Sequence, residues 1–191
     1  MSTVASPAVA GFAPALRRLY FVRFGFALVW AALVVVAGQQ LGPVAAVLLV
    51  LYPLFDVAAA VVDARASKTD PSSRGLYLNI AMSLLAAIGL GIAATSGVPA
   101  VLRVWGAWAI VAGLIQLVVA LRRRTMGGQW PMILSGGISV LAGASFALMA
   151  GQPAPSLVGI AGYATLGGIF FLASALRLGR AARTTTTTPE H

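Results

Sequence analysis

Long apolar runs alternate with short polar segments along the whole of this 191-residue chain. The clearest run is PAVLRVWGAWAIVAGLIQLVVALRRR, which opens on a proline, closes on three arginines and holds 18 consecutive uncharged residues from Val104 to Leu121. At about 1.5 Å of rise per residue, a helix over this run covers a hydrocarbon core about 30 Å thick. The same pattern predicts six membrane-spanning helices, at residues 18–37, 43–62, 76–95, 100–121, 130–150 and 157–176.

Charged residues are divided unequally between the segments that join these predicted spans. The connections at residues 38–43, 96–99 and 151–155 carry no charge. Twelve of the 13 basic residues fall in or beside the other connections and the two tails, and only Arg103 falls on the opposite side. Because short cytoplasmic segments of membrane proteins are enriched in Lys and Arg, we expect both termini in the cytoplasm.

The segments outside the predicted spans divide the chain into one domain and two tails. The first stretch has no positive charge ahead of its apolar residues, unlike a secretory signal peptide, so we interpret it as a mobile cytoplasmic tail. The threonine run near the other end has no apolar period and predicts disorder. We therefore expect an N-terminal tail at 1–16, a six-helix transmembrane domain at 17–179 and a disordered cytoplasmic tail at 180–191.

An internal repeat follows from the spacing of the turn prolines. Prolines recur at an interval of 56 residues, at Pro43, Pro99 and Pro155. Each is followed by a helix with an aromatic residue near its middle, at Tyr52, Trp108 and Tyr163. Each of these helices has a basic end, at Arg65, Arg122 and Arg177. The predicted fold is an all-α integral membrane protein whose six transmembrane helices form three parallel helical-hairpin repeats.

Composition excludes most classes of soluble protein. The chain is 60% hydrophobic and 9% charged, with a mean hydropathy of +0.94, whereas soluble domains carry roughly 25% charged residues. The net charge of +9 lies beside apolar runs, which favours membrane orientation over nucleic-acid binding. There is no cysteine, and the only histidine is His191. No catalytic, cofactor or metal motif is present, so we expect no enzyme and no cofactor.

Asp56 is the one carboxylate well inside a predicted span. An unpaired charge at that depth costs about 3 kcal/mol or more, so a partner is expected. Arg23 lies at a similar depth in the first span, and we predict an ion pair between the two, assisted by the Leu49 carbonyl that Pro53 leaves without a donor. The pair has either a structural role or a proton-responsive role in transport.

Three other polar side chains within spans are candidates for specific contacts. Asn79 and Gln116 lie near the inner ends of their spans, and we expect interhelical hydrogen bonds from both, with substrate contact as the alternative. Arg103 lies near the outer end of the fourth span, where it reaches the outer headgroups or binds an anion. Most of the aromatic residues near span ends are expected in an interfacial belt, namely Tyr20, Trp30, Tyr77, Trp105 and Trp130.

Small residues recur at every fourth position in the third and fifth predicted spans. The fifth span has Ser135, Ser139, Gly143, Ala147 and Gly151 in this spacing. Small side chains let helix backbones approach closely in lipid, so we expect tight helix packing, with a narrow water-filled path as the alternative.

Several segments together resemble the HdeD-type acid-resistance membrane proteins, a short-repeat family. The resemblance covers about residues 16–179 and rests on GQWPMILSGGISVLAGASFALMAG, VWGAWAIVAGLIQLVVALRRR and LYPLFDVAAAV. In the last segment the family usually has Asp followed by Gly, whereas this chain has Asp56 followed by Val57. The resemblance implies a bacterial inner-membrane protein linked to acid or envelope stress, with no established catalytic or binding residue.

Two functions follow from the sequence. The first is a non-enzymatic multi-pass membrane protein for stress tolerance, with membrane lipids and a possible second copy of itself as partners. The second is a small proton-linked transporter or channel that uses Asp56. A lipid-directed intramembrane enzyme is disfavoured because no acid, base or metal set is present. We expect no nucleic-acid partner.

Overall fold

The computed structural model describes residues 7–66, 73–122 and 130–186, and every regular element in these residues is an α-helix. The all-helical prediction from hydropathy is therefore confirmed for this part of the chain. The elements are, in order, α1 Pro7–Ala37, α2 Pro43–Ala66, α3 Ser73–Ala94, α4 Val98–Arg122, α5 Trp130–Met149 and α6 Val158–Thr186.

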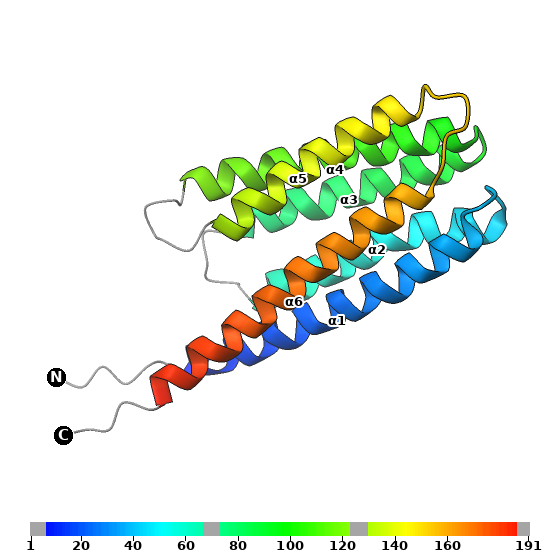
Figure 1. Cartoon of the computed structure of the whole chain (residues 1–191). Helices are drawn as coiled ribbons and strands as arrows, with labels where there is room; N and C mark the ends of the chain where they lie inside the picture. The colour runs from blue at the N-terminus through cyan, green and yellow to red at the C-terminus, as the bar shows by residue number, and fades with distance from the viewer. Residues whose placement is uncertain (1–6, 67–72, 123–129, 187–191) are drawn as a thin grey trace, which may run out of the picture.

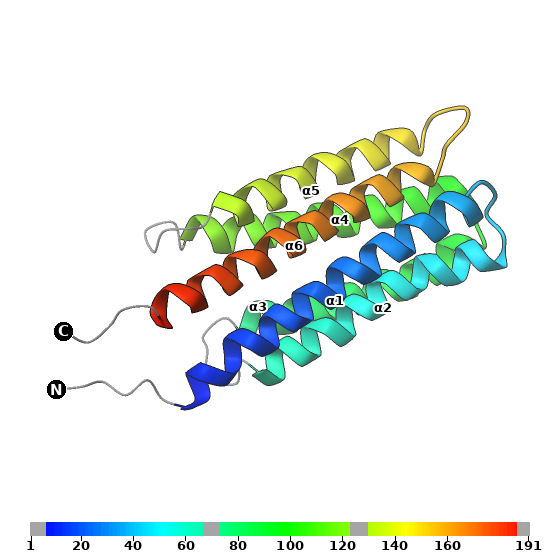
Figure 2. The same ribbon diagram turned by 60° about the horizontal axis from the view of Figure 1, so that its bottom comes forward.

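The helices run alternately in opposite directions along one elongated bundle (Figure 1). α1, α3 and α5 lead away from the end where α1 begins and α6 finishes, and α2, α4 and α6 lead back to it. We call this the terminal end. The closest contacts join α4 to α5, α1 to α6 and α2 to α3, and weaker contacts join α3 to α4, α1 to α2 and α5 to α6. The helices thus follow one another around the bundle, which Figure 2 shows from a second side.

The outer surface of the bundle is apolar. Large hydrophobic side chains are exposed along the helices, among them Val36, Leu141 and Leu148. Water does not favour so much exposed apolar surface, whereas lipid does. Five helices, α1 to α4 and α6, are long and apolar enough to cross a membrane, and the apolar part of α5, Ile133–Met149, is shorter. The chain is a multi-pass helical membrane protein.

Both terminal helices are longer than the sequence predicts. α1 begins at Pro7, and α6 continues to Thr186, so residues 7–16 and 180–186 are helical rather than parts of a mobile and a disordered tail. A proline at the first helical position costs no hydrogen bond, because the N–H there has no partner inside the helix. Adding residues to a helix already formed also costs far less than starting one. The remainder of both predicted tails, residues 1–6 and 187–191, lies outside the described residues.

Aromatic side chains fill the centre of the bundle. Trp30 of α1 stacks on Trp105 of α4 with ring centroids 5.5 Å apart, and Tyr52 of α2 lies 4.6 Å from the Trp30 ring. Trp30 Nε1 also donates to the Leu48 carbonyl of α2 at 2.7 Å. Trp30 and Trp105 are only 1% and 0% exposed, so the belt position predicted for them is wrong. Position near a span end does not determine which side of a helix faces a neighbour.

Glycines bring α4 and α5 into backbone contact at two levels. Gly106 faces Gly143, and Gly113 faces Gly136. A Cβ atom built on Gly143 would lie 2.5 Å from the Gly106 oxygen, and one on Gly136 would lie 2.9 Å from the Gly113 oxygen. No side chain fits between these backbones. Close packing through small residues is the arrangement expected of helices in lipid.

Candidate functional site: the Asp56 cluster

Asp56 is the centre of a polar cluster built from three helices. Its Oδ1 atom forms an ion pair with Arg23 of α1. Its Oδ2 atom accepts hydrogen bonds from Asn79 Nδ2 at 2.7 Å and from Ser83 Oγ at 2.8 Å, both on α3. Asn79 and Ser83 are four residues apart, so one face of α3 presents both donors to the same oxygen. We call Arg23, Asp56, Asn79 and Ser83 the Asp56 cluster.

Arg23 extends the cluster to a fourth helix. Its guanidinium carbon lies 4.5 Å from the centre of the Phe171 ring on α6, which is within the range of a cation–π contact. The Phe171 ring lies 5.7 Å from that of Tyr20 on α1. Through Arg23 and Asp56 the cluster therefore connects α6, α1, α2 and α3.

The cluster is shielded from solvent and its charges are balanced. The side chains of Arg23 and Asp56 are 12% and 19% exposed, and Ser83 is fully buried. Both carboxylate oxygens have donors, one of them charged and two neutral. An unpaired charge in this position would be costly, so each member of the pair stabilises the other in the bundle.

The structure brings together Arg23 and Asp56, the two residues that the sequence pairs, and adds Asn79 to them. Ser83 belongs to the small-residue stripe of the third predicted span, with Asn79, Ala87, Gly91 and Thr95, for which the sequence predicts close helix packing but no contact with Asp56. The sequence feature that could have indicated its role is its position four residues after Asn79, which places both side chains on the same face of the helix. Gln116 is half buried on α4, and Arg103 is exposed in the first two turns of the same helix.

The backbone near Pro53 contacts the aromatic core rather than the ion pair. Pro53 has no N–H to donate to the Leu49 carbonyl, which the sequence assigned to the ion pair. In this stretch the neighbouring carbonyl of Leu48 accepts a hydrogen bond from Trp30 Nε1 at 2.7 Å. The Leu49 carbonyl is an acceptor and could assist only Arg23, whose guanidinium donates to Asp56 Oδ1.

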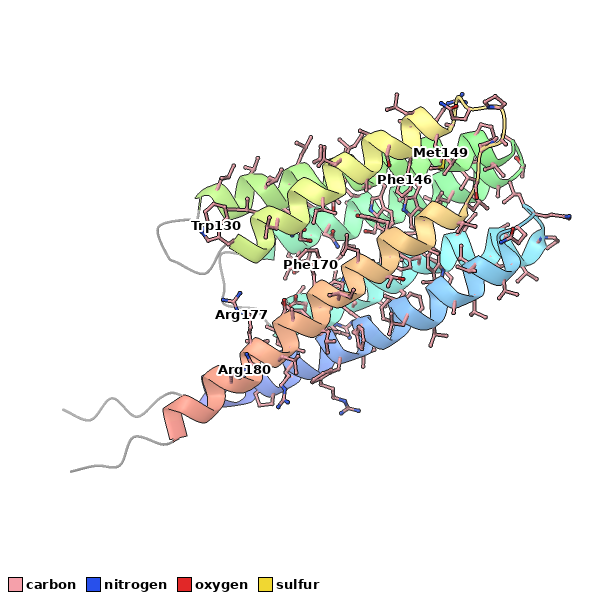
Figure 3. The ribbon with its side chains drawn as sticks, in the orientation of Figure 1. Trp130, Phe146, Met149, Phe170, Arg177 and Arg180 are labelled. Carbon is pink, nitrogen blue, oxygen red and sulfur yellow. The ribbon has the colours of Figure 1, made fainter. Side chains whose placement is uncertain are left out.

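A second polar contact joins the aromatic core to the fifth helix. Tyr163 of α6 donates to Ser139 Oγ of α5 at 3.1 Å, and its ring meets Phe146 edge-on at 5.9 Å. Figure 3 shows Phe146 and Met149 on α5 far from Arg177 and Arg180, which mark the terminal end of α6. Ser139 belongs to the small-residue stripe of the fifth span, so this part of the stripe serves helix contact.

The described residues contain no cluster that could hold a metal ion, and the chain has no match among known proteins. Within residues 7–66, 73–122 and 130–186, no three His, Cys, Asp or Glu side chains lie close enough together to hold a metal ion. The chain matches no protein-family model, no curated protein and no solved structure.

Proposed function

We propose that this chain is a non-enzymatic protein of the bacterial cytoplasmic membrane that supports tolerance of acid or envelope stress. The main support for the proposal is that both oxygens of the Asp56 carboxylate accept hydrogen bonds from side chains of α1 and α3. Such a cluster holds helices in register, and breaking it exposes an uncompensated charge in a poorly solvated place. We therefore assign Arg23 and Asp56 a structural role.

The proposed topology has six spans, with both termini in the cytoplasm. α5 contains 20 residues, which at about 1.5 Å each gives about 30 Å, the thickness of the hydrocarbon core. The terminal end carries Arg17, Arg18, Arg177 and Arg180, whereas Arg103 lies in the first two turns of α4, which begins at the opposite end. The excess of basic residues at the terminal end supports its placement in the cytoplasm.

Three parallel hairpins, α1–α2, α3–α4 and α5–α6, are part of the same proposal. In each, the second helix packs most closely on the first helix of the next hairpin: α2 on α3, α4 on α5 and α6 on α1. Contacts within each hairpin are weaker. A threefold repeat about an axis along the membrane normal would produce this alternation of strong and weak contacts. Pro43 and Pro99 occupy the first and second positions of α2 and α4, as a repeat requires, whereas Pro155 lies three residues before α6 begins at Val158.

The role in stress tolerance rests on the resemblance to HdeD-type proteins in the segments around Asp56, Trp108 and Trp130. Membrane lipids and a second copy of the chain are the proposed partners. Deletion of the gene should lower survival after an acid challenge, and the wild-type gene should restore it. Unchanged survival of the deletion strain under acid and envelope stress would overturn this part of the proposal.

A small proton-linked transporter or channel is the second candidate, because an ionisable carboxylate inside a membrane span is a common proton-relay group. The two candidates are separated by proton flux into liposomes across a pH gradient, with the wild type beside Asp56→Asn and Arg23→Gln. We expect no flux above that of protein-free liposomes in any sample. Wild-type flux that Asp56→Asn abolishes while the protein stays folded would establish the transporter instead.

A further inference from the structure

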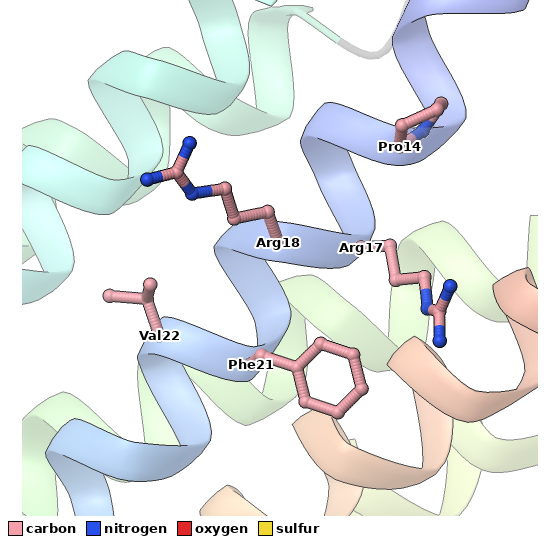
Figure 4. A pocket seen from close by; sticks show the side chains of 5 residues that line it. All are labelled: Pro14, Arg17, Arg18, Phe21 and Val22. Carbon is pink, nitrogen blue, oxygen red and sulfur yellow. The ribbon is translucent and has the colours of Figure 1, made fainter.

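The outer face of α1 carries a pocket at the terminal end of the bundle. It has a volume of about 430 Å³ and is open to the surroundings. Its lining residues are Pro14, Arg17, Arg18, Phe21 and Val22, spaced three and four apart along α1. In Figure 4, Arg17 and Phe21 extend to one side of the helix, and Arg18 and Val22 extend to the other. The two arginines lie one helical turn nearer the terminal end than Phe21 and Val22. The pocket is therefore basic toward the membrane surface and apolar toward the membrane interior.

Arg17 is held in place without an acidic partner in residues 7–66, 73–122 and 130–186. Its guanidinium carbon lies 5.5 Å from the centre of the Phe21 ring, and it rests against α6 at Gly179. A Cβ atom at Gly179 would come within 2.9 Å of that carbon, so the glycine makes room for the guanidinium. The Nε atom of Arg17 is buried and has no hydrogen-bond partner among the described residues.

Arg18 also forms no ion pair with a carboxylate in the described part of the chain. Arg17 and Arg18 thus border the pocket with two positive charges, one on each side of the helix. Guanidinium groups are well matched to phosphate oxygens, which they bind through paired hydrogen bonds.

The apolar part of the pocket continues along α1. Val22, Val29, Leu33 and Val36 are exposed on the same side of the helix. Gly25 lies between them, and nothing lies within 4 Å of the position its Cβ would take. These residues form an exposed apolar stripe along α1 that leads from the pocket toward the far end of the bundle.

We propose that this pocket binds an anionic phospholipid, with the phosphate between the Arg17 and Arg18 side chains and an acyl chain along Phe21, Val22 and Gly25. Charge complementarity and the order of basic and apolar residues favour a lipid over a soluble phosphate. Only a lipid has both a phosphate for the basic part of the pocket and an acyl chain for the apolar part. The proposal needs the chain to span a membrane, and it does not depend on a role in stress tolerance.

The test is lipid binding to the purified protein by native mass spectrometry. Phosphatidylglycerol and phosphatidylcholine are titrated onto the wild type and onto an Arg17→Gln/Arg18→Gln variant. Since each basic residue near a membrane surface contributes roughly five-fold in affinity for anionic lipid, the double variant should bind phosphatidylglycerol about 25-fold more weakly. Binding of phosphatidylcholine should be weaker in the wild type and little changed in the variant.

Two further variants separate this pocket from a general effect of charge. Arg177→Gln removes one charge from the same end of the bundle but lies outside the pocket, and should leave phosphatidylglycerol binding near the wild-type value. Gly179→Ala keeps every charge but displaces the Arg17 guanidinium, and should weaken binding several-fold without loss of folding. Gly162→Ala on the same helix is its control, because nothing lies within 4 Å of the added atom.

Three results would overturn the proposal. The first is equal phosphatidylglycerol binding by the wild type and the Arg17→Gln/Arg18→Gln variant, with circular dichroism showing both folded. The second is an equal loss in Arg177→Gln, which would indicate nonspecific attraction. The third is displacement of phosphatidylglycerol by an equal concentration of soluble glycerophosphoglycerol, which would indicate a site for free phosphate esters.

Discussion

Replacement of Gly143 by alanine tests the close contact between α4 and α5. The added Cβ atom would lie 2.5 Å from the Gly106 oxygen and 2.9 Å from the Ile110 nitrogen. Both are backbone atoms, so no side-chain rotation can relieve the overlap. The first distance is about 0.9 Å short of the 3.4 Å at which ordinary contact begins, so the two helices must separate by an amount of that order. Overpacking of this kind costs about 1–3 kcal/mol.

The matched control is Gly137→Ala on the same helix, where nothing lies within 4 Å of the added atom. Both substitutions gain about 1 kcal/mol of helix propensity, so the difference between the two variants isolates the overlap. We expect Gly143→Ala to unfold more easily than Gly137→Ala by about 1–3 kcal/mol in detergent micelles, measured by denaturant titration followed by tryptophan fluorescence. Equal unfolding free energies for the two variants would refute the close approach of α4 and α5.

Three further predictions concern the cluster, the core and the topology. Ser83→Ala removes one donor to Asp56 and should lower the unfolding free energy by about 1 kcal/mol, checked in the same titration; no change would mean that the bond adds nothing. Trp30→Phe loses the hydrogen bond to α2 and core volume, and should cost about 1–3 kcal/mol, whereas Trp130→Phe at an exposed position should stay within about 0.5 kcal/mol of the wild type. Since the chain has no cysteine, Ser96→Cys should react with an impermeant maleimide added outside intact cells, and a cysteine appended after the last residue should not; the reverse pattern would contradict the proposed orientation.

The helices and the central ion pair can be predicted from the sequence. Each is determined by the free-energy cost of placing a particular segment or charge in the membrane. An apolar run of about 20 residues has few alternatives to a membrane helix, and a lone carboxylate within one needs a partner. Arg23 lies at the depth of Asp56 on the preceding helix, so the choice of partner was narrow. The structure brings these two residues together.

The remaining contacts depend on how the helices are rotated and aligned. Trp30 and Trp105 lie near predicted span ends like belt residues, but their helices turn them toward one another in the core. Gly106 and Gly143 meet only because α4 and α5 are antiparallel in one particular register. That register is set by packing over the whole interface, which no short segment of sequence specifies.

The role of Ser83 illustrates the same point for the site. A serine among small residues on a membrane helix usually contributes to close helix packing, and the sequence analysis predicts that role for the third span. It becomes a donor to Asp56 because α2 and α3 are among the most closely packed pairs in the bundle. The chemistry of the residue was visible in the sequence, whereas its neighbour was not.

The most direct test of a structural role for Asp56 is a double-mutant cycle on the unfolding free energy, with Asp56→Asn, Arg23→Gln and the double variant. Each single change leaves a charge or a donor in the cluster without its partner, at a cost of about 3–5 kcal/mol. The double variant removes both charges together and should be less destabilised than the sum of the singles, by about 2 kcal/mol or more. Single variants as stable as the wild type, with no coupling between them, would contradict a structural ion pair.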